Sequence, residues 1–199
     1  MGIAPYNPNF GQIIKTDAGV NIDHTFLAHY IIPAADADAA GAALILAATE
    51  LGDGVTTTIL AAALAQPPTP RVLSITGNAA TAVGDVVVTG TDFADQPLVE
   101  TIVSTGAATV LGVKAFKSIA SIVLPARGAA ADSISVGLSD KFGIPYMLPN
   151  ASRILLIANG GVATTVAAGS GFSATVLADN FIDPTAALAG AQIDVYILV

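Results

Sequence analysis

Side chains that could carry out metal chemistry are few in this sequence. The two histidines, His24 and His29, are five residues apart, so on a strand they point to opposite faces. A shared metal site is therefore not expected from them. The chain contains no cysteine, which excludes both a disulfide framework and a thiolate metal site.

Two pairs of carboxylates stand close together in the sequence. Asp92 and Asp95 lie in the turn-like stretch GTDFAD, where aspartate commonly bonds to its own backbone. Asp36 and Asp38 could touch a calcium ion, but the spacing of an EF-hand loop with its terminal glutamate is absent. Acid–base work on a glycoside needs two carboxylates across a cleft, and neither pair indicates one.

No motif for a nucleophile or a phosphate loop is present. The stretch Gly169-Ser170-Gly171 lacks the G-x-S-x-G pattern of a nucleophile elbow. Gly77-Asn78 and Gly84 are not followed by the Gly-Lys-Ser/Thr of a phosphate-binding loop. The sequence therefore predicts a protein that is not an enzyme, with no catalytic residue, no cofactor and no metal.

The composition indicates a chain whose surface is buried against other subunits. Of 199 residues, 11% are charged and 53% hydrophobic, whereas soluble domains carry about 25% charged residues. The best candidate for a membrane helix, Ala39–Leu46, is far shorter than the roughly 20 apolar residues that spanning requires. The net charge of −8 and seven scattered basic residues argue against nucleic acid as a partner. A homo-oligomer is expected, with neither membrane nor nucleic acid as partner.

Short runs rich in Val, Ile and Thr, broken by Gly, Asn, Asp and Pro, organise the chain from Arg71 to Leu138. This pattern predicts an all-β fold, an antiparallel β-sandwich or barrel of jelly-roll-like kind with an extended N-terminal arm. The turn Asn159-Gly160-Gly161 is a strong hairpin signal. The predicted strands are 71–76, 85–89, 97–104, 114–124, 132–138, 152–158, 163–168, 171–177 and 193–199.

The domain plan has three parts: residues 1–33 as arm and first strand, 34–70 as a mixed region, and 71–199 as the main β-domain. Ala34–Leu51 reads as a helix or as a strand, and Gly52-Asp53-Gly54 favours a strand hairpin with Val55–Leu60. The prolines of Gln66–Pro70 form a stiff connector.

Two segments are predicted as subunit contacts. Met1–Asp23 is irregular, yet it carries apolar residues that a disordered tail lacks, so we expect it to order against a neighbour or its own core; a loose terminus is the alternative. Lys141–Pro149 holds two prolines and is a loop that either caps the sandwich or contacts another subunit. The predicted interface residues are Ile3, Tyr6, Phe10, Ile13, Ile14, Phe142, Ile144, Tyr146 and Met147.

The stretch between Arg71 and Tyr146 also resembles a family. Its pattern ITG…VVVTGTD…ETI…G…KAFKSI.SI.LPA, followed by DSISVGLSDKFGIPY and by the ending IDVYILV, is similar to small β-rich structural proteins of tailed bacteriophages, of the head-decoration kind. The first seventy residues match least well. These motifs are structural and carry no active site.

The resemblance implies a capsid decoration or cement protein that binds the outer head shell and stabilises it. Its partners would be the major capsid protein and other copies of itself, with a trimer suited to a three-fold position of a shell. The sequence opens without a basic segment and apolar core, which favours synthesis in the host cytoplasm and a final location on the virion. A tail, collar or receptor-binding module is the alternative, and a depolymerase would need a carboxylate pair in a cleft.

Overall fold

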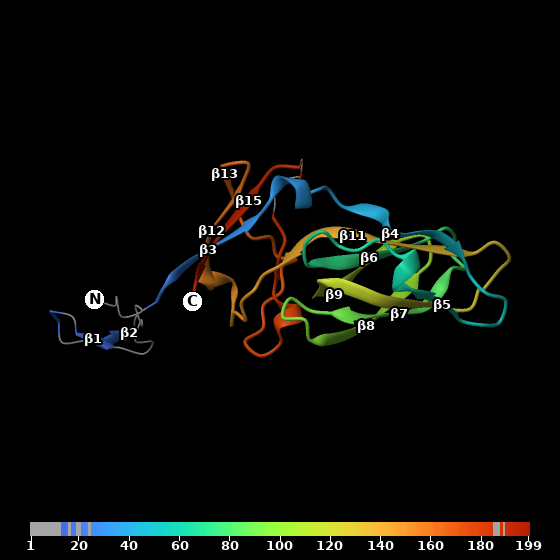
Figure 1. The fold of residues 1–199 in the computed structure, drawn as a ribbon, viewed down its shortest axis with the longest axis horizontal. Coiled ribbons are helices and arrows are strands. Elements are labelled where there is room, and N and C mark those ends of the chain that lie inside the picture. Colours follow the sequence, from blue (N-terminus) through green and yellow to red (C-terminus); the bar gives the residue numbers. More distant parts are fainter. Residues whose placement is uncertain (1–12, 16, 19–20, 24, 185–187, 189) are drawn as a thin grey trace, which may run out of the picture.

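The fold was analysed in a computed structural model, which describes residues 13–15, 17–18, 21–23, 25–184, 188 and 190–199. These residues form an all-β protein with several antiparallel sheets, none closed into a barrel, and no α-helix. Figure 1 shows a sandwich in green to yellow on the right and a smaller sheet of blue and red strands on the left. The all-β prediction is confirmed.

The first sheet of the sandwich has the strand order β5-β10-β7-β8. The strands are β5 (Thr57–Leu60), β10 (Ser118–Leu124), β7 (Val83–Thr91) and β8 (Pro97–Thr105). In β8 buried and exposed residues alternate without a break, as the sequence pattern predicts for a strand with one buried face.

The second sheet faces the first and has the order β14-β11-β6-β9, with β4 also paired to β11. The strands are β4 (Gly41–Glu50), β6 (Arg71–Gly77), β9 (Thr109–Phe116), β11 (Ser133–Gly143) and β14 (Phe181–Ile182). The core between the two sheets includes Leu73, Val88, Ile122, Ile134 and Val136, all with no exposed surface. Burial of such side chains, at about 1.5–3 kcal/mol each, is what holds the sandwich together.

The smaller sheet has the order β13-β12-β15-β3 and a core of its own. Its strands are β3 (Leu27–Ile32), β12 (Ile154–Asn159), β13 (Val162–Thr164) and β15 (Ile193–Leu198). The predicted hairpin is present: Asn159 pairs with Val162, and Gly160 and Gly161 both have the positive φ that a type I′ turn demands.

The remaining elements are short. Two N-terminal strands, β1 (Ile13–Lys15) and β2 (Asn21–Asp23), pair with each other. Single-turn 3₁₀ helices are η1 (Ala34–Asp36), η2 (Ala61–Ala63), η3 (Ala151–Arg153) and η4 (Leu177–Asp179).

Two predictions are wrong: the pairing of one hairpin and the extent of one strand. The strands of the expected hairpin around Gly52-Asp53-Gly54 exist, but β4 pairs with β11 and β5 with β10, so the turn carries the chain from one sheet to the other. The single strand predicted for 114–124 is divided at Lys117 between β9 and β10, which also lie in opposite sheets. The pairing of β10 with β7 shifts register between Ile119 and Ser121.

The predicted strand 171–177 is absent because a side chain takes over the backbone bonding there. Asn180, which is fully buried, accepts from the N–H groups of Ser173 and Leu148 and donates to the carbonyls of Ser173 and Val176. An asparagine amide that satisfies the backbone in this way competes with a strand ladder. The predicted strand 163–168 is likewise shorter, since β13 ends at Thr164.

The hydrophobic cores divide the chain differently from the three-part domain plan. The region 34–70 contributes β4 and β5 to the sandwich, whereas β3 joins the C-terminal strands in the smaller sheet. The end of β11 leaves the sandwich core, and Phe142 and Ile144 belong to the core of the smaller sheet.

Candidate functional site

The carboxylates of Asp92 and Asp95, one of the two pairs singled out in the sequence, have structural roles. One oxygen of Asp92 accepts from the N–H groups of Ala94 (2.8 Å) and Gln96 (3.0 Å), closing the β7–β8 turn. Asp95 pairs with Lys117 at 2.7 Å on the surface. Across the part of the chain that the structure describes, no group of three His, Asp or Glu side chains is placed to hold a metal ion. Nor do these residues include a helix long and apolar enough to cross a membrane.

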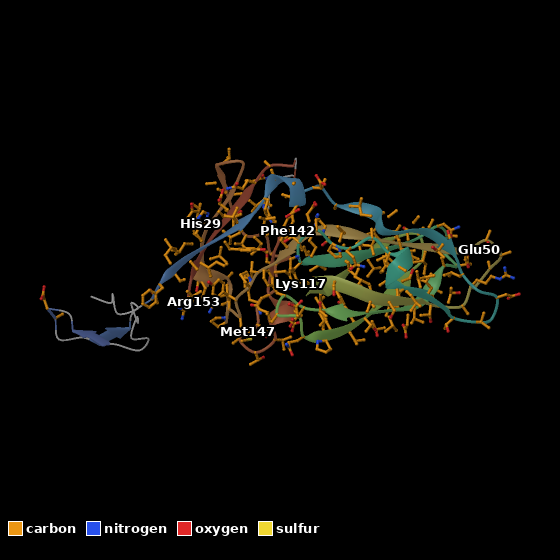
Figure 2. All side chains as sticks on the ribbon, viewed as in Figure 1. His29, Glu50, Lys117, Phe142, Met147 and Arg153 are labelled. Atoms are coloured by element: carbon orange, nitrogen blue, oxygen red, sulfur yellow. The ribbon has the colours of Figure 1, made fainter. Side chains whose placement is uncertain are left out.

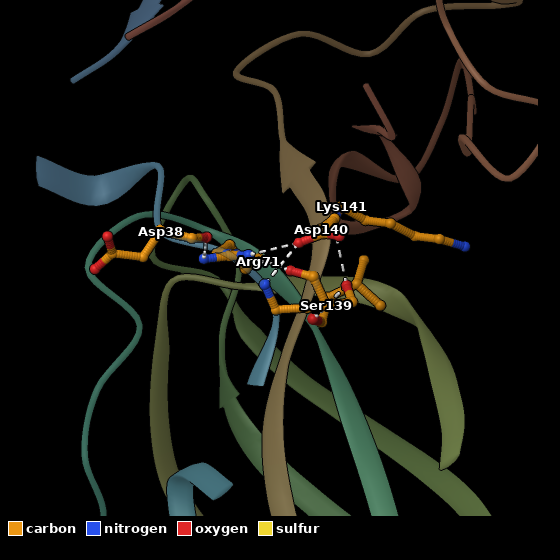
Figure 3. A network of polar contacts seen from close by, with 7 residues as sticks. Asp38, Arg71, Ser139, Asp140 and Lys141 are labelled. Atoms are coloured by element: carbon orange, nitrogen blue, oxygen red, sulfur yellow. Dashed lines mark hydrogen bonds and ion pairs between the residues drawn. The ribbon is translucent and has the colours of Figure 1, made fainter. Parts of the chain in front are cut away.

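A polar network centred on Arg71 joins the sandwich to the segment after β3 (Figure 3). The Arg71 guanidinium donates to the carbonyl oxygen of Ser139 and, at 2.9 Å, to that of Asp38. It also lies 3.8 Å from the Asp140 carboxylate and 4.5 Å from the centre of the Phe142 ring. Planar stacking with several donors is the geometry that arginine provides and lysine does not.

The arginine at the centre of this network stabilises the fold. Burial lowers the pKa of Arg71 to about 10, against the opposing effect of Asp140 and Asp38, so the side chain is a cation at neutral pH. Because Arg71 has no exposed surface, it cannot contact a substrate or partner. Its donors instead fix the position of Asp38 relative to β11.

A second unusual group is Glu100, which points into the sandwich from β8. One of its oxygens accepts from the Val113 N–H at 2.6 Å, and the other is buried with no hydrogen-bond partner. Burial is the main cause that raises the pKa of Glu100, and the nearby Asp179 carboxylate raises it further. An oxygen of Asp179 is likewise buried and unpartnered.

Asp179 lines an open cavity of about 460 Å³, but the charges around it do not select one kind of ligand. Lys114, Lys141 and Phe181 also line it. The Lys114 ammonium donates to the Val99 carbonyl, and that of Lys141 lies 5.5 Å from the centre of the Phe181 ring. The two ammonium groups would repel a purely cationic ligand, and the carboxylate would repel a purely anionic one.

We expect Glu100→Gln to stabilise the protein at neutral pH. In the unfolded chain this carboxyl ionises near its ordinary pKa of 4.5, whereas the folded protein keeps the proton to higher pH. The free energy of unfolding therefore falls as the pH rises from the ordinary pKa through the raised one. Glutamine keeps an oxygen that can accept from the Val113 N–H and removes the buried negative charge, which should regain about 1–3 kcal/mol at pH 8 and nothing near pH 4.

Urea unfolding at both pH values checks this expectation. The control is Glu50→Gln, because the Glu50 side chain is exposed. Equal effects of the two substitutions, or a gain for Glu100→Gln that is the same at pH 4 and pH 8, would contradict the assignment.

The surface best suited to a function is the outer face of the smaller sheet. We define this outer face as the side chains of β3, β15 and β12 that point away from the core: Leu27, His29, Ile31, Leu156, Asp194, Tyr196 and Leu198. Leu27 is 60% exposed, Ile31 45% and Leu156 40%. Two of the three strands, β3 and β12, thus present large aliphatic side chains to the outside, where alternation normally places polar residues. Leu198 of β15 is half-buried beside them.

The centre of the outer face is rigid. The rings of His29 and Tyr196 stack with their centres 4.4 Å apart and their planes within 3°, a geometry that adds to the burial energy. His29 also lies 2.8 Å from the Asp194 carboxylate, which accepts from the Gln192 side chain as well. Figure 2 shows His29 on the smaller sheet, to the left of the sandwich, and Glu50 near the right-hand end of the sandwich.

The predicted interface residues of Lys141–Pro149 separate into two groups. Phe142 and Ile144 are fully buried in the core of the smaller sheet. These two side chains are therefore not on the surface, and the core that they cover is that of the smaller sheet, not the end of the sandwich. Tyr146 and Met147 line a groove of about 310 Å³ together with Leu198 and Val199. Met147 is 53% exposed, and the groove adjoins the outer face through Leu198.

The predicted interface residues of the N-terminal arm are only partly described. Ile3, Tyr6 and Phe10 lie outside the described residues, as does His24. Ile13 and Ile14 are in β1, opposite Asp23 and Ile22 of β2. The prediction that they form contacts with another subunit stays a prediction.

Sequence reasoning missed the outer face, although signals for it exist. The stretch Leu27–Ile32 is apolar at almost every position, which is typical of a strand that is covered on both faces. The sequence also contained a signal that Glu100 is buried, because Glu100 alternates in phase with Leu98 and Ile102 on the core side of β8.

Comparisons with protein-family models, with curated proteins and with solved structures each found no match for this chain. The similarity to phage structural proteins therefore stays an expectation, and the case for a function depends on the surfaces described above.

Proposed function

We propose that the chain is a non-enzymatic structural subunit of a virus particle, a capsid decoration protein that associates with copies of itself and binds the outer head shell. Stabilisation would follow from mass action, since a protein that binds only the assembled shell favours assembly. The partners are other copies of the chain and the major capsid protein.

The outer face of the smaller sheet is the observation that carries this proposal. Exposed aliphatic side chains of β3 and β12, gathered on one face of the sheet, are typical of a contact between proteins. With 11% charged residues, the chain also has few groups to keep an isolated surface hydrated. An interaction role fits both features, whereas Arg71 and Glu100, the unusual polar groups, are buried and serve the fold.

A tail, collar or receptor-binding module is the second candidate within the same class. It would need an exposed cluster of aromatic or polar side chains for a receptor or glycan. Stacked His29 and Tyr196 are such a pair, but aliphatic side chains surround them, which favours contact with protein.

The experiment is to separate heads from tails of the virus that encodes the chain and to count copies in each fraction by mass spectrometry. We expect hundreds of copies per head, counted relative to the major capsid protein, with a tail protein as the marker of purity. A few copies per particle, or copies in the tail fraction alone, would move the function to the second candidate. Absence from both fractions would refute the proposal.

A further inference from the structure

The N-terminal hairpin is bound to no other strand of the described chain. β1 and β2 pair with each other, and no described strand outside the hairpin pairs with either of them. Figure 1 shows the hairpin at the far left, beyond the end of β3. A two-stranded hairpin is at best marginally stable alone in water, so this one needs a surface to pack on.

The hairpin is joined directly to a strand that has unsatisfied pairing capacity. β3 pairs with β15 along one side, and no described strand pairs with its other side. A free edge of six residues beside an apolar face is a site that proteins usually cover. Leu27 and Ile31, the most exposed side chains of β3, lie on that face.

The size of the outer face shows that it cannot form a stable contact alone. Three strands of about six residues span roughly 20 Å by 15 Å, or about 300 Å². Two such faces packed on each other would bury about 600 Å², whereas stable interfaces bury about 1,200–2,000 Å² in total. A second element must contribute the rest.

The N-terminal arm has the composition for that role. Ile3, Tyr6, Phe10, Ile13 and Ile14 give it apolar side chains at intervals of one to four residues. Because residues 13–23 fold back as the hairpin, the reach of the arm comes from residues 1–12, which span at most about 40 Å when extended.

We propose that residues 1–23 of one copy bind the outer face of the smaller sheet, and the free edge of β3, in a second copy, so that the copies exchange arms. This names the contact of the self-associating subunit proposed above and rests on that proposal. The exchange gives the hairpin a surface to pack on and gives the unpaired edge of β3 a partner. It also places Tyr146 and Met147, which adjoin the face through Leu198, at the border of the contact.

The test uses two complementary variants. The acceptor lacks residues 1–23 and keeps the face; every strand of the two cores keeps its partners, because β1 and β2 pair with each other. The donor keeps the arm and carries Leu27→Asp and Ile31→Asp. Sedimentation velocity should show the unaltered chain as an oligomer, each variant alone as a monomer, and their equimolar mixture as a one-to-one heterodimer.

Matched controls separate the face from general effects of added charge. Val99→Asp with Val103→Asp changes two side chains of β8 that are exposed to a similar degree, and this variant should assemble as the unaltered chain does. A second donor carries Leu156→Asp on β12, so that a folding defect confined to β3 cannot decide the result. Circular dichroism verifies that each variant is folded.

Two results would overturn arm exchange: an acceptor that still forms the full oligomer, or folded donors that give no heterodimer with it. Particles that carry the chain while the mixture stays monomeric would leave the proposed function standing without the exchange. If the mixture forms the heterodimer but the chain is missing from particles, arm exchange is established and the proposed role in the virion is refuted.

Discussion

Replacing Arg71 with alanine should lower the free energy of unfolding by about 2–5 kcal/mol, since it leaves two backbone carbonyls without donors and opens a space beside Phe142. Arg71 is the largest fully buried side chain of the described residues. Its guanidinium joins Ser139 on β11 to Asp38 in the segment between β3 and β4. The loss should therefore loosen the connection between the sandwich and the smaller sheet, as well as lower overall stability.

Thermal and urea unfolding measure this loss, and each kcal/mol corresponds to about 2–4 °C in a chain of this size. Arg71→Met removes the donors but keeps most of the side-chain volume. It should therefore be less destabilising than Arg71→Ala, which also leaves a cavity. Arg153→Ala is the control, because Arg153 lies at the surface end of η3 and makes no ion pair with a described residue. Equal stability of the Arg71 and Arg153 variants would show that the network contributes nothing.

Deleting Ile193–Val199 should abolish the smaller sheet. β15 lies between β12 and β3 and is the only strand among those described that joins them. It buries Ile193, Val195 and Ile197 completely, and at about 1.5–3 kcal/mol for each side chain their loss approaches the whole stability of a domain, about 5–15 kcal/mol.

Limited proteolysis and circular dichroism of the truncated protein test this expectation. The region after Gly143 should become rapidly cleaved while fragments of the sandwich persist, because the sandwich core does not include β15. Removal of Val199 alone is the control, since that residue is partly exposed. A soluble truncated chain that unfolds in one cooperative transition, with protease resistance unchanged, would contradict the role assigned to β15.

The sequence by itself determined several of the strands and, in β8, the face that is buried. Alternation predicted β8 with its inward side, and the paired glycines after Asn159 predicted the β12–β13 turn, because only glycine readily adopts the two positive φ angles that this turn requires. The terminal strand was predicted too, from the β-prone residues of Ile193–Val199. Each of these features depends on local backbone and side-chain physics, which a short window of sequence contains.

Only the tertiary structure decided which strands pair and which surface is left open. The residues of β4 and β5 favour strands, but either sheet of a sandwich can accept such a strand, so the turn between them can stay within one sheet or cross to the other. The run through Lys117 could not be divided into β9 and β10 for the same reason. The outer face of β3, β15 and β12 emerges from strands more than a hundred residues apart, and Arg71 is buried by segments distant in sequence. Both depend on packing between segments that are far apart in the sequence, and a local sequence pattern does not determine such packing.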